Sequence, residues 1–138
     1  MKKITKMLVA IFLIAILSMT SITSFASDEG ISPRLSHLND AAFSFSATAN
    51  GGYIDVTYYG YDDSFVRADL TVKIEKRFLI FWWTEVTTWS ASSTEIEGHF
   101  ANKFNLDGSG TYRATFTLTI TGNDGTVDTI PSELKDSY

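Results

Sequence analysis

Strict alternation of apolar and polar side chains constrains this chain most, because successive residues of a β-strand point to opposite faces of a sheet. From residue 66 to residue 75 every second side chain is apolar, and the side chains between them are charged or threonine. Residues 111–121 repeat the pattern, with aromatic and aliphatic side chains opposite threonines and one arginine. These segments predict half-buried strands. The side chains expected in the core are Ile54, Val56, Leu70, Val72, Ile74, Tyr112, Phe116 and Leu118.

Shorter alternating segments raise the number of expected strands to seven: residues 41–48, 53–59, 82–89, 94–101 and 126–130. Turn sequences rich in Gly, Asn, Asp and Ser separate the strands: Asn50–Gly52, Tyr61–Ser64, Ser90–Ser93, Asp107–Gly110 and Gly122–Gly125. Pro131 ends the last strand or confines it to a sheet edge. Seven short strands with regularly spaced turns predict an all-β fold, an antiparallel β-sandwich of two sheets with about seven strands.

The N-terminal 26 residues carry the three parts of a secretory signal peptide. Three lysines lie within Met1–Lys6, an apolar run covers Met7–Leu17, and the small residues of a cleavage point lie in Ser24–Ala26. The apolar run is shorter than the ~20 residues of a stable membrane span. We therefore expect cleavage after this stretch, a flexible arm over residues 27–40, a β-sandwich domain over residues 41–138, and secretion of the protein.

Charge and cysteine content narrow the classes of partner. The whole chain has 11 basic and 16 acidic residues, a formal charge of −5, and loss of the three leader lysines would leave 8 basic residues and a charge of −8. Such a chain repels nucleic acid, so no nucleic-acid partner is expected. The chain has no cysteine. An exported domain of this kind depends on packing instead of disulfides, which is common among exported proteins of Gram-positive bacteria.

Gly110–Ala114 resembles the start of strand F in immunoglobulin domains, where a tyrosine hydroxyl bonds back to the preceding corner. Ala114 stands where many of those domains have a cysteine, which fits a chain without disulfides. Together with Ile31–Arg34 and Trp83–Trp89, this corner makes the chain similar to a family of short secreted proteins of Gram-positive gut bacteria. The resemblance implies export and an immunoglobulin-like sandwich. That family has no established activity, so the resemblance implies no functional residues.

The run Phe78-Leu79-Ile80-Phe81-Trp82-Trp83 is apolar where a polar hairpin turn is expected. Alternate residues of a strand point to opposite faces, so six consecutive large apolar side chains do not all face one core. Either the strands extend through the run and a neighbouring loop covers its second side, or the run is an exposed tip that binds a partner. Under the second interpretation the protein is a secreted, non-enzymatic binding module, and these six residues are its binding site.

Lys76 and Arg77 precede this run and would also suit a lipid interface, with Trp82 and Trp83 at the level of the headgroups. The acidic body of the protein opposes that contact, so we expect a protein partner at the cell surface or outside the cell. A membrane-active secreted factor that uses the same tip is the alternative. A carbohydrate-binding platform is a third alternative, because the chain has 6 tyrosines and 3 tryptophans. Nothing in the sequence places these aromatic side chains on one face.

Signatures of catalysis are weak throughout the sequence. His37 and His99 are the two histidines, and Glu95 and Glu97 form an acidic pair of a kind common on solvated strands. The sequence has no Gly-rich phosphate loop and no pair of His or Cys at metal-ligand spacing. We therefore expect no enzymatic activity, no cofactor and no metal site.

Overall fold

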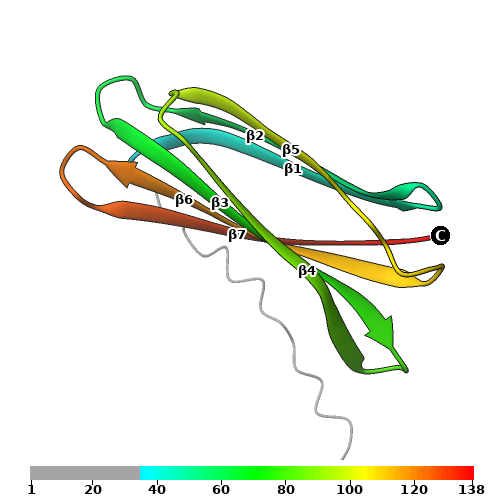
Figure 1. Ribbon diagram of the computed structural model, residues 1–138. Helices are drawn as coiled ribbons and strands as arrows, with labels where there is room; N and C mark the ends of the chain where they lie inside the picture. The colour runs from blue at the N-terminus through cyan, green and yellow to red at the C-terminus, as the bar shows by residue number, and fades with distance from the viewer. Residues whose placement is uncertain (1–34) are drawn as a thin grey trace, which may run out of the picture. The chain divides into compact units, whose positions relative to one another are not determined.

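The computed structural model describes residues 35–138, so the predicted signal peptide and most of the predicted arm lie outside this range. Within it the chain forms seven strands and no helix. The strands are β1 (Leu38–Thr48), β2 (Gly51–Gly60), β3 (Phe65–Phe78), β4 (Trp82–Ser93), β5 (Glu97–Phe104), β6 (Thr111–Gly122) and β7 (Val127–Ser137). Figure 1 shows that they form two layers.

Two antiparallel sheets make up these layers. One sheet has the strand order β1-β2-β5, and the other has the order β4-β3-β6-β7. All adjacent strands run antiparallel. This order corresponds to the A-B-E and C′-C-F-G sheets of immunoglobulin-like domains. The chain is therefore an immunoglobulin-like antiparallel β-sandwich of seven strands, as the alternation and the resemblance at Gly110–Ala114 together predicted.

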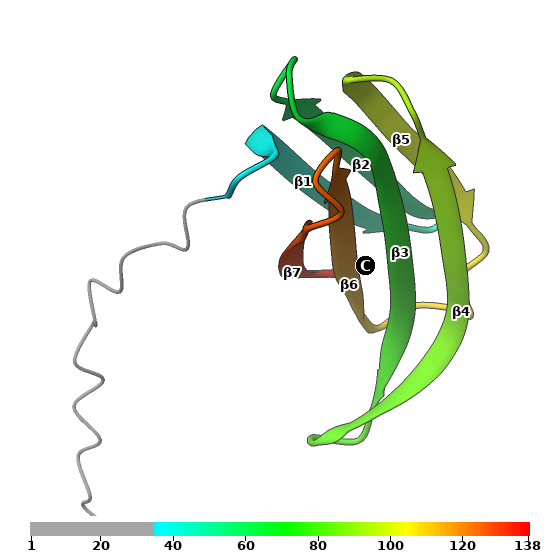
Figure 2. The ribbon, with the colours of Figure 1, turned by 90° about the vertical axis from the view of Figure 1, so that its left-hand side faces the viewer.

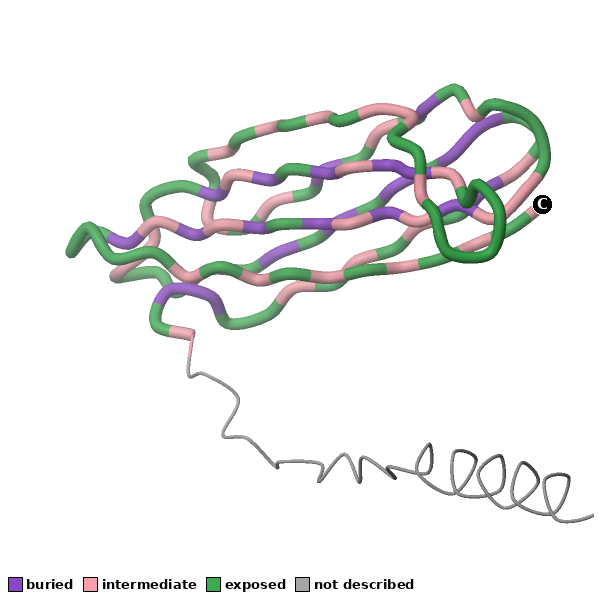
Figure 3. Tube along the Cα trace, turned by 90° about the horizontal axis from the view of Figure 1, so that it is seen from below, coloured by how far each residue is buried: buried purple, intermediate pink, exposed green. Residues whose placement is uncertain are grey.

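The core lies between the inner faces of the two sheets, and Figure 3 shows buried and exposed residues alternating along the strands. All eight predicted core residues are buried, and none is more than 3% exposed. Ring pairs join the two sheets, with centroids 5.4 Å apart for Phe43 and Phe116 and 6.4 Å apart for Trp89 and Phe104. Aromatic packing of this kind holds the layers together without a disulfide.

Several strand boundaries and one outward side chain differ from the sequence prediction. Val66 lies on the alternating apolar face of residues 66–75 but is 46% exposed, because the pairing of β3 with β6 shifts between Phe65 and Arg67 and the bulge turns this side chain outward. β5 covers Glu97–Phe104, three residues later than the strand predicted over residues 94–101, and β2 begins at Gly51, inside the predicted Asn50–Gly52 turn. β4 continues through the predicted Ser90–Ser93 turn, since these residues pair with β3. β1 begins inside the predicted arm, at Leu38. β7 continues past Pro131 as an edge strand, where proline is tolerated.

The corner before β6 has the hydrogen bond that the Gly110–Ala114 sequence predicted. Tyr112 is fully buried, and its hydroxyl donates to the carbonyl oxygen of Gly108 at 2.6 Å. Burial raises the pKa of Tyr112, so the hydroxyl keeps its proton and remains a donor. The ring of Tyr138 stacks on Tyr112 with centroids 6.1 Å apart, and its hydroxyl donates to the same carbonyl oxygen. This corner fixes the loop between β5 and β6, which lies beside the β3–β4 hairpin.

Candidate functional site

The apolar segment Phe78–Trp83 forms the turn of the β3–β4 hairpin, which projects past the other strands at one end of the sandwich (Figures 1 and 2). β3 pairs with β6 only as far as Lys76, and beyond this residue its one strand partner is β4. Phe78 pairs with Trp82, which leaves a three-residue loop of Leu79, Ile80 and Phe81. The end of the hairpin is therefore a two-stranded extension with no third strand beside it.

Five consecutive side chains at the end of this hairpin are exposed to solvent. The exposed fractions are 59% for Phe78, 71% for Leu79, 77% for Ile80, 81% for Phe81 and 68% for Trp82. The interpretation that a neighbouring loop covers the run is wrong for these residues. We call Phe78–Trp82 the hairpin tip. Contiguous exposed apolar surface on a folded domain usually marks an interaction site.

Backbone strain accompanies this exposure. Leu79 has φ = 58°, the only positive φ at a non-glycine residue in the described chain. The left-handed conformation costs an L-residue with a bulky side chain about 1–2 kcal/mol, and turns that need it commonly use Gly or Asn. The hairpin therefore keeps a leucine where glycine would fit the backbone better. Strained residues of this kind cluster at functional sites.

Trp83, the sixth predicted binding residue, lies outside the tip and is only partly exposed. Three cationic groups surround its ring. The guanidinium carbons of Arg113 and Arg77 lie 4.3 and 5.3 Å from the ring centroid, and the ammonium of Lys135 lies 5.8 Å from it. Cation–π contacts of this kind hold an aromatic ring in place. Trp83 is therefore part of the support of the hairpin and not of its exposed end.

A buried carboxylate fixes one of the cations that contact Trp83, Arg113. Glu75 is 7% exposed, and one of its oxygens accepts hydrogen bonds from Nε and Nη2 of Arg113 at 2.9 and 2.7 Å. Its other oxygen lies 3.3 Å from the ammonium of Lys73. Arg113 also lies 3.6 Å from Glu133. Charge-assisted bonds to a buried acid hold Arg113 in one orientation, and Trp83 packs on it. The outer face of β3, β6 and β7 thus forms a fixed base for the hairpin.

Charged side chains are unevenly divided between the two ends of the sandwich. We call the ends of the strands nearest the hairpin tip the tip half, and the opposite ends the far half. Six of the seven basic residues of the described chain lie in the tip half, namely Lys73, Lys76, Arg77, Lys103, Arg113 and Lys135. Arg67 is the remaining one and lies in the far half.

Acidic side chains show the opposite distribution. Five lie in the tip half, namely Glu75, Glu85, Asp107, Glu133 and Asp136. Eight lie in the far half, namely Asp40, Asp62, Asp63, Asp69, Glu95, Glu97, Asp124 and Asp128, and Asp55 lies midway along β2. The tip half thus has six basic against five acidic side chains, and the far half has one against eight. The negative charge of the domain is concentrated at the end away from the tip.

The two unpaired cations closest to the tip are Lys76 and Arg77. Neither forms an ion pair within the described chain. The ammonium of Lys76 donates to the carbonyl oxygen of Asp107, which connects the hairpin to the loop before β6. The guanidinium of Arg77 lies over the ring face of Trp83. The charge of Arg77 is therefore available to a partner of the tip, whereas the ammonium of Lys76 is held at the loop before β6.

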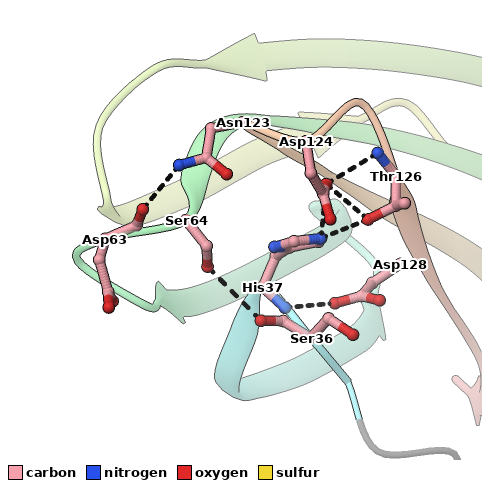
Figure 4. A network of polar contacts seen from close by, with 8 residues as sticks. All are labelled: Ser36, His37, Asp63, Ser64, Asn123, Asp124, Thr126 and Asp128. Carbon is pink, nitrogen blue, oxygen red and sulfur yellow. Dashed lines mark hydrogen bonds and ion pairs between the residues drawn. The ribbon is translucent and has the colours of Figure 1, made fainter.

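His37 anchors a polar network in the far half (Figure 4). Its ring is buried, with Nε2 2.6 Å from the hydroxyl of Thr126 and 3.4 Å from Asp124, and its backbone N–H donates to Asp128 at 2.7 Å. Hydrogen bonds from the hydroxyl and the N–H of Thr126 hold the pKa of Asp124 below its usual value. A Cβ at Gly122 would collide with the ring of His37, so glycine leaves the space that the ring fills. The network fastens the start of β1 to the β6–β7 hairpin, which is a structural role.

The other aromatic residues do not gather into one platform. Tyr58 is 2% exposed and lies in the core, and Trp89 packs between the sheets. Tyr53 and Tyr59 face outward from β2, on the sheet that does not carry the hairpin. His99 on the same outer face lies 2.6 Å from Asp55. This arrangement gives the carbohydrate alternative no common surface for the tyrosines and the tip tryptophan.

Among residues 35–138 no group of three or more His, Cys, Asp or Glu side chains is arranged to hold a metal ion. The same residues include no helix of the length and hydropathy needed to cross a membrane. Comparisons with protein-family models, with curated proteins and with solved structures each find no match to this chain. The resemblance to secreted proteins of gut bacteria stays a prediction.

Sequence reasoning identified the tip and the cations Lys76 and Arg77 but missed Arg113, Lys135 and Glu75 as its support. A signal for them is present in the sequence. In an antiparallel sandwich the end of β3, the start of β6 and the end of β7 lie at the same end of a sheet. Charged residues at those strand ends therefore meet once the strand order is known.

Proposed function

We propose that this chain is a secreted, non-enzymatic binding module whose docking element is the hairpin tip. The observation that supports this function is the set of five consecutive large apolar side chains, each more than half exposed, on a projecting hairpin. Complete burial of one such side chain contributes about 1.5–3 kcal/mol. A partner that covers several of them gains substantial binding energy without any rearrangement of the sandwich.

The supporting base adds to this proposal. Trp83, Arg113 and Glu75 fix the hairpin before a partner arrives, so little conformational freedom is lost on binding. The strained leucine fits the same function, because a glycine at position 79 would relieve the backbone but remove apolar surface. No cofactor or catalytic residue enters the proposal.

Two classes of partner fit an apolar tip. The sequence favoured a protein partner, because the negative charge of the whole chain opposes contact with a membrane. The distribution of charge favours a membrane surface instead. The acidic side chains are concentrated in the far half, and the unpaired cations Lys76 and Arg77 lie next to the tip.

Serine substitution of Phe81 and Trp82 together tests the proposed docking element. The chain from residue 27 onward is labelled, and its melting temperature and its retention on intact bacterial and animal cells are measured. The control variant replaces Val66 and Val127 by serine. These two side chains lie in the far half and are 46% and 52% exposed. Surface changes usually cost under about 0.5 kcal/mol each, so both variants are expected to keep their melting temperature within a few degrees.

Retention on cells is expected to fall for the tip variant and not for the control. Equal retention of the tip variant and the wild type would show that the tip is not the docking element. A loss of several kcal/mol of stability in the tip variant would show that these side chains are part of the core.

A further inference from the structure

We propose that the partner of the hairpin tip is a lipid bilayer with anionic headgroups, and that the tip inserts into its interfacial region. This inference rests on the proposed function, because it identifies what the docking element binds. Three features of the described chain lead to it: the order of side chains along the hairpin, the lack of polar groups in the tip, and the division of charge between the two ends of the molecule.

The order of side chains along the hairpin matches the layers of a bilayer interface. Ile80 and Phe81 lie at the apex and are the most exposed apolar residues of the tip. Trp82 follows, and aromatic residues of this type prefer the boundary between acyl chains and headgroups. Arg77 and Lys76 come next, and the exposed side chain of Arg77 can reach lipid phosphates. Apolar, amphipathic and cationic side chains thus succeed one another with distance from the apex.

Polar side chains are missing from the tip itself. Phe78–Trp82 includes no side chain that forms strong hydrogen bonds, apart from the indole N–H of Trp82. A specific protein interface of ordinary size carries about ten direct hydrogen bonds and a polar rim around its apolar centre. A narrow apolar wedge provides neither, whereas an acyl-chain region requires neither. The tip therefore fits the apolar interior of an interface better than the surface of a protein.

Insertion of this hairpin is shallow. Unpaired backbone groups are costly in hydrocarbon, and beyond Lys76 the loop at the apex and the outer edges of both hairpin strands have no strand partner. Interfacial segments typically bury their apolar side chains about 5–10 Å below the headgroups. At that depth Ile80 and Phe81 reach the acyl chains, and the charged base of the hairpin stays in water.

The division of charge orients the domain toward an anionic surface. The far half has one basic against eight acidic side chains, and the tip half has six against five. An anionic bilayer repels the far half and attracts the unpaired cations beside the tip. At an ionic strength of 0.15 M the Debye length is about 8 Å, so the acidic end, at the opposite end of the strands, is screened from a surface at the tip. The net negative charge of the chain thus does not oppose tip-first contact.

Vesicle binding tests the inference. The chain from residue 27 onward is used, because Arg34–Tyr138 forms a compact unit with its own core. Co-sedimentation is measured with vesicles of phosphatidylcholine alone and with vesicles of phosphatidylcholine mixed with phosphatidylglycerol. Quenching of tryptophan fluorescence by lipids brominated along the acyl chain reports insertion, and Trp82→Phe identifies the tryptophan that is quenched.

The wild type is expected to bind the anionic vesicles, and its fluorescence to be quenched only while Trp82 is present. The Phe81→Ser, Trp82→Ser variant is expected to bind more than about tenfold more weakly. Arg77→Gln is expected to bind anionic vesicles about fivefold more weakly. The matched control is Arg67→Gln, which removes the one basic residue of the far half and is expected to leave vesicle binding unchanged. Lys76 is left in place because it supports the loop before β6.

Several results would overturn the inference. Absence of binding to anionic vesicles, equal binding to both kinds of vesicle, or quenching that persists in Trp82→Phe would each exclude insertion of the tip into an anionic bilayer. Retention on cells that depends on the tip, without binding to vesicles, would leave the docking element established and assign it to a protein partner. Retention that is independent of the tip would contradict the proposed function itself.

Discussion

Replacement of Leu79 by glycine is expected to make the domain more stable and its tip less apolar. The left-handed conformation costs a bulky L-residue about 1–2 kcal/mol, and glycine adopts it freely. Glycine also increases the entropy of the unfolded chain, which costs about 0.5–1 kcal/mol. Leu79 is 71% exposed, so its removal sacrifices little buried surface. The net gain is about 0.5–1 kcal/mol, which corresponds to roughly 2–6 °C in melting temperature for a domain of this size.

Urea unfolding followed by tryptophan fluorescence and thermal unfolding followed by circular dichroism measure this gain. Leu79→Ala is the matched control, because alanine removes the same apolar atoms beyond Cβ but keeps the Cβ that causes the strain. The alanine variant is expected to be no more stable than the wild type. A glycine variant that gains nothing, or an alanine variant that gains as much, would refute the assignment of strain to position 79.

Two further predictions concern the corner before β6 and the hydrogen bond that joins β7 to β1 of the other sheet. Tyr112→Phe removes the hydrogen bond to Gly108 and is expected to lower the free energy of unfolding by about 1 kcal/mol in urea, more than Tyr138→Phe at the exposed hydroxyl. Hydrogen bonds from the N–H groups of Ala47 and then Ser137 hold the pKa of Asp136 below its usual 3.8. Asp136 thus stabilises the fold at a pH above its unfolded pKa, and this contribution is lost as the pH falls through the lower native pKa. The free energy of unfolding is measured between about pH 2 and pH 6. Asp136→Asn is expected to reduce the dependence of this free energy on pH over that range.

The sandwich could be predicted from the sequence because burial and strand geometry impose the same period. Residues such as Leu70 and Phe116 alternate with threonines or charged residues, and this pattern is compatible with only one buried face per strand. Exceptions occur where pairing with a neighbouring strand decides the outcome. Val66 keeps the alternating pattern in the sequence but leaves the core at a bulge whose position depends on the register with β6. No local signal in β3 fixes that register.

The candidate site could be predicted in its composition but not in its exposure. The run from Phe78 to Trp83 conflicts with the polar character of a hairpin turn, which was visible in the sequence. Its exposure depends on how far β6 extends beside β3, and the two strands are separated by a long stretch of chain. The concentration of acids in the far half also follows from topology, because successive turns of an antiparallel sandwich alternate between its ends. That division of charge removes the reason for preferring a protein partner over a membrane.

β3 runs without interruption from the acidic end of the molecule to the hairpin tip, and it pairs with β6 on one side and with β4 on the other. This continuity has a mechanical consequence for a domain held at its tip. The hydrogen bonds between antiparallel strands lie perpendicular to the strands, so a pull along β3 loads the whole ladder at once in shear instead of opening it one pair at a time. A tip held by a surface would therefore transmit drag on the sandwich mainly through the pairing of β3 with β6, which joins the hairpin to the rest of its sheet.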